Sequence, residues 1–189
     1  MIDIDKTIQE HLDVVAGVRP LASDIAVVAG CVADCLAAGG KVLWMGNGGS
    51  AANSQHLAAE LIGRYSRERS GLASIALTTD TSILTAVAND YGYEMIFARQ
   101  IDALCHAGDV VIGISTSGNS PNVIEALKIA NKRKAMTVGF AGGNGGAMQS
   151  EVQHCLIVPS NVTARIQEAH ILIGHMICDW VEASVVDGN

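Results

Sequence analysis

His56 and Glu60 are the first side chains in this sequence that could carry out acid–base chemistry together. In a helix, their spacing of four residues places them on one face, one turn apart. An imidazole beside a carboxylate can exchange protons with a substrate or bind a metal ion. The same spacing is common in surface pairs without a function, so the neighbouring residues must decide between the two readings.

The pair follows a strand, a glycine-rich turn and the start of a helix. KVLWM (41–45) is typical of a short buried strand, GNGGSAANS of a tight turn, and QHLAAELIGR of a helix. Glycine at three positions of this turn lets backbone N–H groups approach a ligand, and Ser50 could cap the helix and reach an anion. Together with the helix dipole this predicts a phosphate cradle, although glycine-rich turns also occur without ligands. The turn matches neither G-x-G-x-x-G nor the P-loop.

A second cradle is predicted where the apolar strand VVIGIS (110–115) runs into STSGNSP (115–121) and the helix NVIEALKIANKRK. Pro121 suits a first helical turn, where its missing N–H would be unpaired anyway. Three serines and a threonine at a helix start exceed what capping requires, and their hydroxyls can bond phosphate or sugar oxygens. We therefore favour ligand binding over capping alone for this segment.

Composition limits the class of protein. The 189 residues suit one domain with a substantial core, and the net charge of −7 argues against a broad nucleic-acid surface. The N-terminus lacks the layout of a signal peptide, and no apolar run looks long enough to span a bilayer. The five cysteines form no C-x-x-C motif and are expected to be reduced, largely buried thiols of a cytosolic protein.

About five strands alternate with helices, which predicts an α/β fold with a doubly wound parallel sheet and ligands at the carboxyl ends of the strands. We expect a single domain over residues 1–189. Two added N-terminal helices (1–38) would take part in oligomer packing, and residues 39–189 would form the α/β core. The long apolar helix from residue 163 to 185 suggests a subunit interface, and on spacing alone a histidine in it, His170 or His175, is more often a hydrogen-bonded core residue than a catalyst. RYSRERSG (64–71) is either a solvated linker or a substrate-side loop.

Four blocks taken together identify a family. GNGGSAANSQHLAAEL, ALTTDTSILTAVANDYGYE, GISTSGNSPNVIEAL and TARIQEAHILIGH occur in order, and essentially the whole chain closely resembles the phosphoheptose isomerases of the sugar isomerase (SIS) fold. The resemblance implies a five-stranded parallel sheet flanked by helices, in a homotetramer with active sites at subunit contacts. It implies a cytoplasmic enzyme that converts sedoheptulose 7-phosphate to D-glycero-D-manno-heptose 7-phosphate, the entry to heptose for bacterial lipopolysaccharide or related glycans. No nucleic acid or membrane partner is expected.

The resemblance also implies roles for particular residues. Glu60 matches the family's general base and His175 its acid/base partner. The expected substrate contacts are Asn47, Gly48, Gly49, Ser50, Glu60, Asn89, Asp90, Ser115, Thr116, Ser117, Ser120 and Gln167. One zinc ion (Zn2+) per subunit is expected on His56, Glu60, Gln167 and His175. Ala164 stands where some members have Asp, so one minor substrate contact is expected to be missing.

The residue types suit this reaction on chemical grounds too. Moving a proton between C1 and C2 through an enediol needs a carboxylate for the carbon-bound proton and a second group for the oxygen protons. A cation or donor near the enediolate oxygen stabilises its charge. Gln167 and His175, however, are eight residues apart, or roughly 12 Å of helix rise. We therefore expect at least one of these two ligands to come from a neighbouring subunit.

Two other functions remain open. A non-catalytic regulator of the same fold, resembling the bacterial replication-initiator-associating protein, shares the glycine turn and RIQE. Such a scaffold does not need a carboxylate and an imidazole at the positions of Glu60 and His175, and this chain has both. An isomerase of another sugar phosphate would use the same residues, and the length of its pocket would distinguish it.

Overall fold

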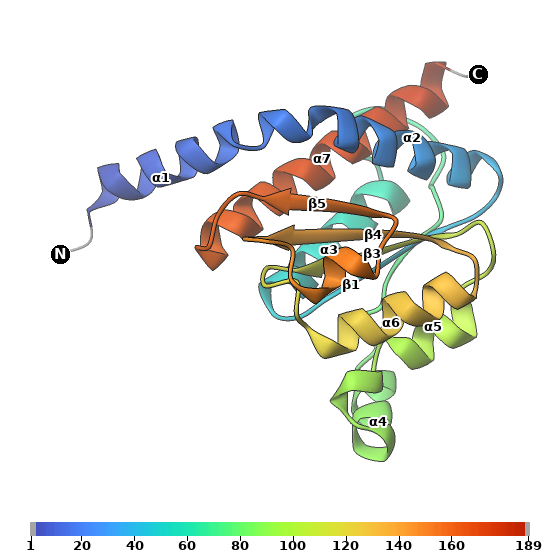
Figure 1. Cartoon of the computed structure of the whole chain (residues 1–189). Coiled ribbons are helices and arrows are strands. Elements are labelled where there is room, and N and C mark those ends of the chain that lie inside the picture. Colours follow the sequence, from blue (N-terminus) through green and yellow to red (C-terminus); the bar gives the residue numbers. More distant parts are fainter. Residues whose placement is uncertain (1–2, 188–189) are drawn as a thin grey trace.

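The computed structural model describes residues 3–187 and arranges them around one parallel sheet with the strand order β2-β1-β3-β4-β5 (Figure 1). The strands are β1 (Val42–Gly46), β2 (Ser74–Ala76), β3 (Val110–Ser115), β4 (Met136–Gly142) and β5 (His154–Val158). The predicted doubly wound, five-stranded sheet is thereby confirmed. After β1 the chain adds β2 on one side and then β3 on the other, so the winding reverses between β1 and β3. Ligands of such sheets bind at this point, beyond the carboxyl ends of the strands.

Helices cover both faces of the sheet (Figure 1). They are α1 (Ile4–Ala16), α2 (Ala22–Ala37), α3 (Gly49–Ile62), α4 (Thr81–Tyr91), α5 (Ala98–Leu104), α6 (Pro121–Lys132) and α7 (Thr163–Asp187). Short 3-10 turns occupy Arg19–Leu21, Tyr93–Met95 and Ala147–Ser150. The second of these turns leads directly into α5.

Alternation along β1 divides the core into two clusters. Trp44 faces α2, α3 and α7 and packs with Leu57 and Ile173, whereas Leu43 and Met45 face α5 and α6. All five residues of β1 are buried, as expected for a parallel strand covered on both faces. Register places Gly46 of β1 beside Ile114 of β3, so both strands end at the same level. The two predicted cradles consequently emerge side by side.

Two segments differ from the expectation about membranes. By length and composition, Ile4–Ala37 and Thr163–Val186 are long and apolar enough to cross a bilayer, so the sequence reading was wrong on this point. Within the fold the first segment is divided by the 3-10 turn after α1, and α7 buries Ile173, Ile177 and Val181 in the core. The apolar residues of α2 and α7 thus serve packing in the fold described, whereas α1 has no buried residue.

α1 extends away from the body of the molecule, with the N-terminus at its far end (Figure 1). Asp3 caps it by accepting a hydrogen bond from the main-chain N–H of Lys6. From its first half to its middle, α1 is tied to α7, because the Arg165 guanidinium donates to the carbonyl of Thr7 and His11 bonds Glu168. The five cysteines are free and range from buried to partly exposed.

Candidate active site

The turn from β1 into α3 is shaped by its glycines. Gly48 has φ +54° and ψ −120° and is the residue before the helix, a conformation that side chains rarely adopt. A Cβ on Gly49 would lie 2.5 Å from Nε2 of Gln167, so glycine is needed there for the Gln167 amide to reach the turn. Ser50 is not the expected cap. The helix begins at Gly49 with Gly48 as its N-cap, so Ser50 lies buried inside the first turn of α3.

The turn from β3 into α6 gathers its hydroxyls without using them as caps. Ser115 Oγ and Ser120 Oγ are 2.8 Å apart, and Ser117 Oγ lies 3.5 Å from Ser115 Oγ. Ser120 occupies the N-cap position of α6, yet its side chain makes no capping bond. These hydroxyls therefore remain available to a ligand at the N-terminal end of a helix, which is the geometry of an anion site.

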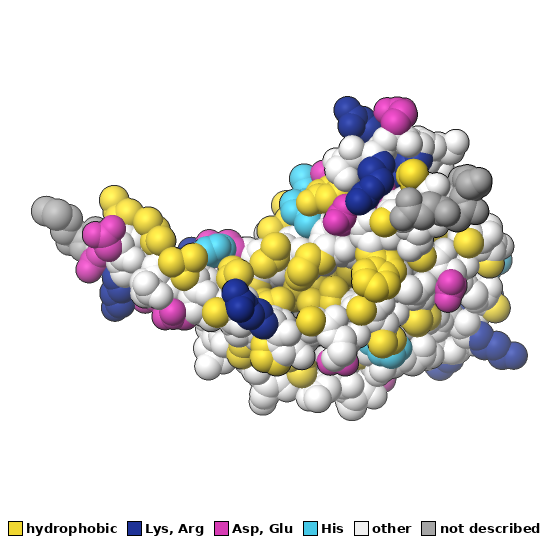
Figure 2. All heavy atoms as spheres, turned by 90° about the horizontal axis from the view of Figure 1, so that it is seen from above, with side chains coloured by type: hydrophobic (Ala, Val, Ile, Leu, Met, Phe, Trp, Pro, Cys, Tyr) yellow, Lys and Arg dark blue, Asp and Glu magenta, His cyan; other side chains and the backbone are white. Residues whose placement is uncertain are grey.

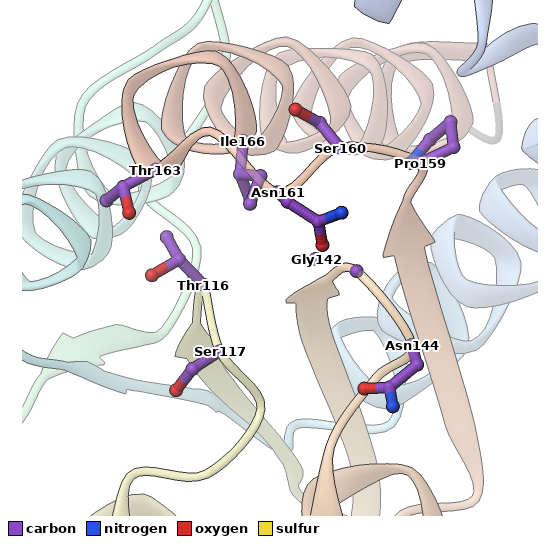
Figure 3. Close-up of a pocket in the computed structure, with 10 residues that line it drawn as sticks. Thr116, Ser117, Gly142, Asn144, Pro159, Ser160, Asn161, Thr163 and Ile166 are labelled. Carbon is purple, nitrogen blue, oxygen red and sulfur yellow. The ribbon is translucent and has the colours of Figure 1, made fainter.

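A cavity of about 570 Å³ opens at the ends of β3, β4 and β5 beside the start of α7 (Figure 3). Thr116 and Ser117 line one side of it. The other lining residues were not predicted: Gly142, Gly143, Asn144, Pro159, Ser160, Asn161, Thr163 and Ile166. The sequence signal for them was the glycine cluster after β4 and the Ser160-Asn161 pair that follows β5.

His170 bonds to the end of β4, the strand that leads into this cavity. It is fully buried on α7, and its Nε2–H donates to the main-chain oxygen of Ala141, 3.0 Å away and next to Gly142. Burial lowers the pKa of His170 to about 4, despite the opposing bond to Ala141. The expectation of a hydrogen-bonded core histidine is confirmed.

His56 and Glu60 of α3 meet His175 of α7. His56 Nε2 lies 2.8 Å from His175 Nε2 and 3.1 Å from Glu60 Oε1, and ligand atoms of all three residues fall within 4.8 Å of one another. Close approach of the two helices makes this possible, since a Cβ on Gly174 would lie 2.4 Å from Leu57 Cδ1. Burial, and then His56, lower the pKa of His175, while Glu60 opposes them. The neutral imidazole is therefore favoured at neutral pH.

The polar loop after α3 folds back onto this cluster. The Tyr65 ring lies 5.2 Å from that of His175. Glu182, fully buried on α7, accepts from the main-chain N–H groups of Tyr65, Ser66 and Arg67 and pairs with Arg69 at 3.0 Å. Burial alone would raise the pKa of Glu182, but these bonds bring it below its ordinary value.

Arg69, whose side chain is 2% exposed, also donates to the main-chain oxygens of Glu60 and Leu61 at 2.8 Å each. It thereby satisfies carbonyls that the end of α3 leaves unpaired. A merely solvated linker is therefore wrong for Arg69, whose side chain is a buried clamp. The alternative of a substrate-side loop stays a prediction. A lone Glu among apolar helix residues was the only sign of the partner of Arg69.

One helical stripe connects the turn to the cluster. Gly49, Asn53, His56 and Glu60 follow one another at spacings of four, three and four along α3, and all face α7. Asn53 Nδ2 donates to the main-chain oxygen of Gln167, which places Gln167 at the turn end of this stripe. His56 lies seven positions after Gly49, which corresponds to about 10 Å of helix rise.

The predicted residues thus divide into three groups. His56, Glu60 and His175 are together within one chain, so His175 needs no neighbouring subunit to reach the other two. Gln167 lies against Gly49 instead. Asn89 and Asp90 are exposed at the end of α4, where Asn89 Nδ2 donates to Asp90 Oδ1. Among residues 3–187, no hydrogen bond or ion pair joins these two to the turns or to the cluster.

Comparison with known proteins agrees with this fold and site. The SIS domain family matches residues 8–142. A phosphoheptose isomerase of Paramagnetospirillum magneticum is 58% identical over 95% of this chain and 94% of its own length. One from Aquifex aeolicus is 54% identical over 97% of each chain. The solved structure of phosphoheptose isomerase from Neisseria gonorrhoeae has a TM-score of 0.90 and 43% identity, and covers 95% of this chain and 97% of that one.

Proposed function

The chain belongs to the phosphoheptose isomerase family of SIS-domain proteins, and on this basis we propose that it is an aldose–ketose isomerase acting on sedoheptulose 7-phosphate. The product is D-glycero-D-manno-heptose 7-phosphate, a precursor for bacterial heptose and lipopolysaccharide synthesis in the cytoplasm. The observation that carries the proposal is the meeting of Glu60 and His175, which are 115 residues apart in sequence, in one cluster along the helix that starts at the glycine turn.

In the reaction, Glu60 removes the carbon-bound proton from C1 and returns it to C2, and His175 moves protons on the two oxygens. Such a positioned pair accounts for much of the rate of an enediol isomerisation. The hydroxyls of Ser115, Thr116, Ser117 and Ser120 and the backbone of Gly48 and Gly49 hold the phosphate. The lowered pKa of His175 keeps its imidazole neutral and able to accept a proton at neutral pH.

The length of the α3 stripe supports a long sugar. His56 and Glu60 lie about 10 Å and 16 Å of helix rise beyond Gly49, and side chains lean back toward the helix start. An extended seven-carbon sugar phosphate separates C1 from phosphorus by about 10 Å at bond lengths near 1.5 Å. Shorter sugar phosphates would leave one end of the site empty.

The decisive experiment incubates the purified protein with sedoheptulose 7-phosphate and follows aldose formation by NMR. Fructose 6-phosphate and ribulose 5-phosphate serve as six- and five-carbon controls. We expect kcat/KM to fall with each carbon removed. Equal turnover of a shorter ketose would favour the isomerase of another sugar phosphate. No aldose from any of the three, with the protein folded, would favour the non-catalytic regulator.

Zinc fits the cluster. Two imidazole nitrogens and a carboxylate oxygen that converge within 4.8 Å are a donor set that Zn2+ accepts with one position left open. We propose that His56, Glu60 and His175 hold one ion per subunit, with Gln167 as the fourth ligand. When bound, the ion would act as a Lewis acid that stabilises negative charge on the substrate's oxygens. Because Gln167 lies at the Gly49 end of the stripe, it would have to come from another subunit or move.

Metal analysis tests this assignment. We expect about one zinc per chain in the purified protein and its loss from a His56→Ala variant, whereas His154→Ala, at the edge of the sheet, should keep it. Retention of zinc by His56→Ala would contradict the ligand set. Full activity after complete removal by a chelator would make the ion dispensable for turnover.

A homotetramer is proposed from the surfaces left uncovered. Ile4, Ile8 and Leu12 form an apolar stripe on α1 and are 69%, 52% and 53% exposed. A groove of about 420 Å³ between α2 and α7, lined by residues such as Ile25, Leu172 and Trp180, lies on the same face of the molecule (Figure 2). Such contiguous apolar surface marks an interface. We place residues 1–38 in the oligomer contacts of a single 1–189 domain, with Asn89 and Asp90 reaching a neighbour's site.

Light scattering tests this assembly. The protein should have four times the mass of one chain, and Leu12→Asp should reduce that mass because a charge would be buried at the contact. Glu10→Gln, on the same helix and exposed, is the matched control and should leave it unchanged. A wild-type monomer would contradict the proposal.

A further inference from the structure

Asn122, in the first turn of α6, is a buried amide that none of the predicted substrate contacts includes. Its side chain is 2% exposed, although asparagine usually lies at the surface. It forms a reciprocal pair with Asn47 of the glycine turn: Asn47 Nδ2 donates to Asn122 Oδ1 at 2.9 Å, and Asn122 Nδ2 donates to Asn47 Oδ1 at 2.8 Å. The pair joins the two turns that were predicted to hold the phosphate.

A third bond determines which way both amides face. The main-chain N–H of Val123 is shared between Asn122 Oδ1, 3.0 Å away, and the main-chain oxygen of Ser120, 3.1 Å away. An N–H can only donate, so oxygen and not nitrogen of Asn122 must occupy that place. The Asn122 amide nitrogen then faces Asn47, and only the oxygen of Asn47 can accept from it. The N-terminal turn of α6 thus sets the orientation of a side chain in a different turn.

Among the bonds within residues 3–187, this orientation leaves Asn47 with a single free group. Its Oδ1 already accepts from Asn122 and from the Tyr93 hydroxyl at 3.1 Å, which uses both lone pairs. One of its two amide hydrogens is bonded to Asn122. The other hydrogen remains, beside a recess of about 200 Å³ that Asn47 lines together with Tyr93, Ser120 and Asn122.

We propose that Asn122 is a positioning residue that makes Asn47 a donor-only contact, offering one N–H to an oxygen atom of the substrate. The inference rests on the proposed function for the identity of that substrate. Asn122 itself does not touch the sugar phosphate. It acts by preventing the Asn47 amide from turning its oxygen toward the negatively charged ligand, where it would repel the phosphate or compete with the donors of the turn.

Asn122→Asp is the sharpest substitution, since it keeps the shape of the side chain and the acceptor for Val123. The variant cannot donate to Asn47, and an oxygen would face an oxygen at 2.8 Å. We expect KM for sedoheptulose 7-phosphate to rise about tenfold, with kcat within about threefold, because a uniform binding contact is lost. Asn122→Ala, which adds no charge, should show the same division between KM and kcat.

Asn131→Asp is the matched control. Asn131 lies at the other end of α6, donates to the main-chain oxygen of Glu151 and accepts from Thr137 Oγ1. Its substitution adds the same charge to α6 without touching Asn47, so KM should stay within about twofold. An unchanged KM in both folded Asn122 variants, or an equal rise in Asn131→Asp, would overturn the inference.

NMR of the Asn47 side-chain amide provides a readout that does not need turnover. Its two hydrogens should give separate, slowly exchanging signals in the wild type, and one of them should shift when the sugar phosphate is added. In Asn122→Ala the selective shift should be lost, although the two hydrogens still give separate signals because rotation about the amide C–N bond is slow. If the wild type shows no isomerisation, the proposed function fails, and this amide experiment, with inorganic phosphate as the probe, still decides the role of Asn122. Equal shifts of both hydrogens in the wild type would refute it.

Discussion

His170 should make the stability of the fold depend on pH above the range in which carboxylates titrate. Its pKa is about 4 in the folded chain because the imidazole is fully buried, against an ordinary value of 6.5. Between pH 6.5 and pH 4, the His170 imidazole binds a proton in the unfolded chain but not in the folded chain. The free energy of unfolding therefore includes the full contribution of the neutral His170 above pH 6.5, and it falls as the pH is lowered toward 4.

The difference in pKa gives the magnitude. A difference of about 2.5 units at 1.36 kcal/mol each corresponds to about 3 kcal/mol lost across this window. The slope cannot exceed about 1.4 kcal/mol per pH unit for one group. The free energy of unfolding of a folded domain is typically about 5–15 kcal/mol, and we expect this chain to lie in that range. The loss is therefore a large share of its stability.

His170→Gln isolates the effect, since a glutamine amide nitrogen can replace Nε2 as donor to Ala141 and does not titrate. Urea unfolding at fixed protein concentration, from pH 8 to pH 4, measures the free energy of unfolding for both proteins. At pH 8 the variant should be within about 2 kcal/mol of the wild type. Toward pH 4 the difference between the two curves should move by about 3 kcal/mol in favour of the variant. Parallel curves would refute this explanation of the buried imidazole.

Three further outcomes are expected. Ser117→Ala should chiefly raise KM through a lost phosphate contact, and an unchanged KM in steady-state kinetics would count against the hydroxyl cradle. Glu182→Gln should cost about 3–5 kcal/mol in urea unfolding, because it leaves the guanidinium of Arg69 buried without its carboxylate. The same change at Glu125, in an exposed pair with Lys128, should cost about 1 kcal/mol or less, and equal costs would contradict the clamp. The loss of unfolding free energy caused by Glu182→Gln should shrink below pH 4.5, because the wild-type carboxylate is itself protonated as the pH falls through its lowered pKa.

The sheet and its two cradles were predictable because local signals agreed with the final fold. Apolar runs such as VVIGIS became strands with nearly the expected bounds, and the turns after β1 and β3 meet because parallel strands end at one edge. Helix starts were less certain. Ser50 has the residue type of a cap, yet Gly48 can adopt the φ of +54° that begins α3 earlier.

Contacts between distant segments account for what the sequence could not give. The pairing of His56 with His175 spans 119 residues, and that of Arg69 with Glu182 spans 113. No periodicity in either segment specifies its partner. Asn122 was not among the predicted site residues, because its role depends on its hydrogen bonds with Asn47, which lies 75 residues earlier. The cavity after β4 was missed because glycines carry no side chain that suggests a ligand.

The acid–base role of Glu60 is the central claim, and one comparison tests it most directly. Wild type and Glu60→Gln are mixed with sedoheptulose 7-phosphate, aldose formation is followed by NMR, and binding of the sugar phosphate is measured by calorimetry on the same samples. We predict rapid conversion by the wild type and almost none by the variant, with the affinities of the two within about tenfold. Turnover by Glu60→Gln at the wild-type rate would contradict the assignment of this carboxylate as the base.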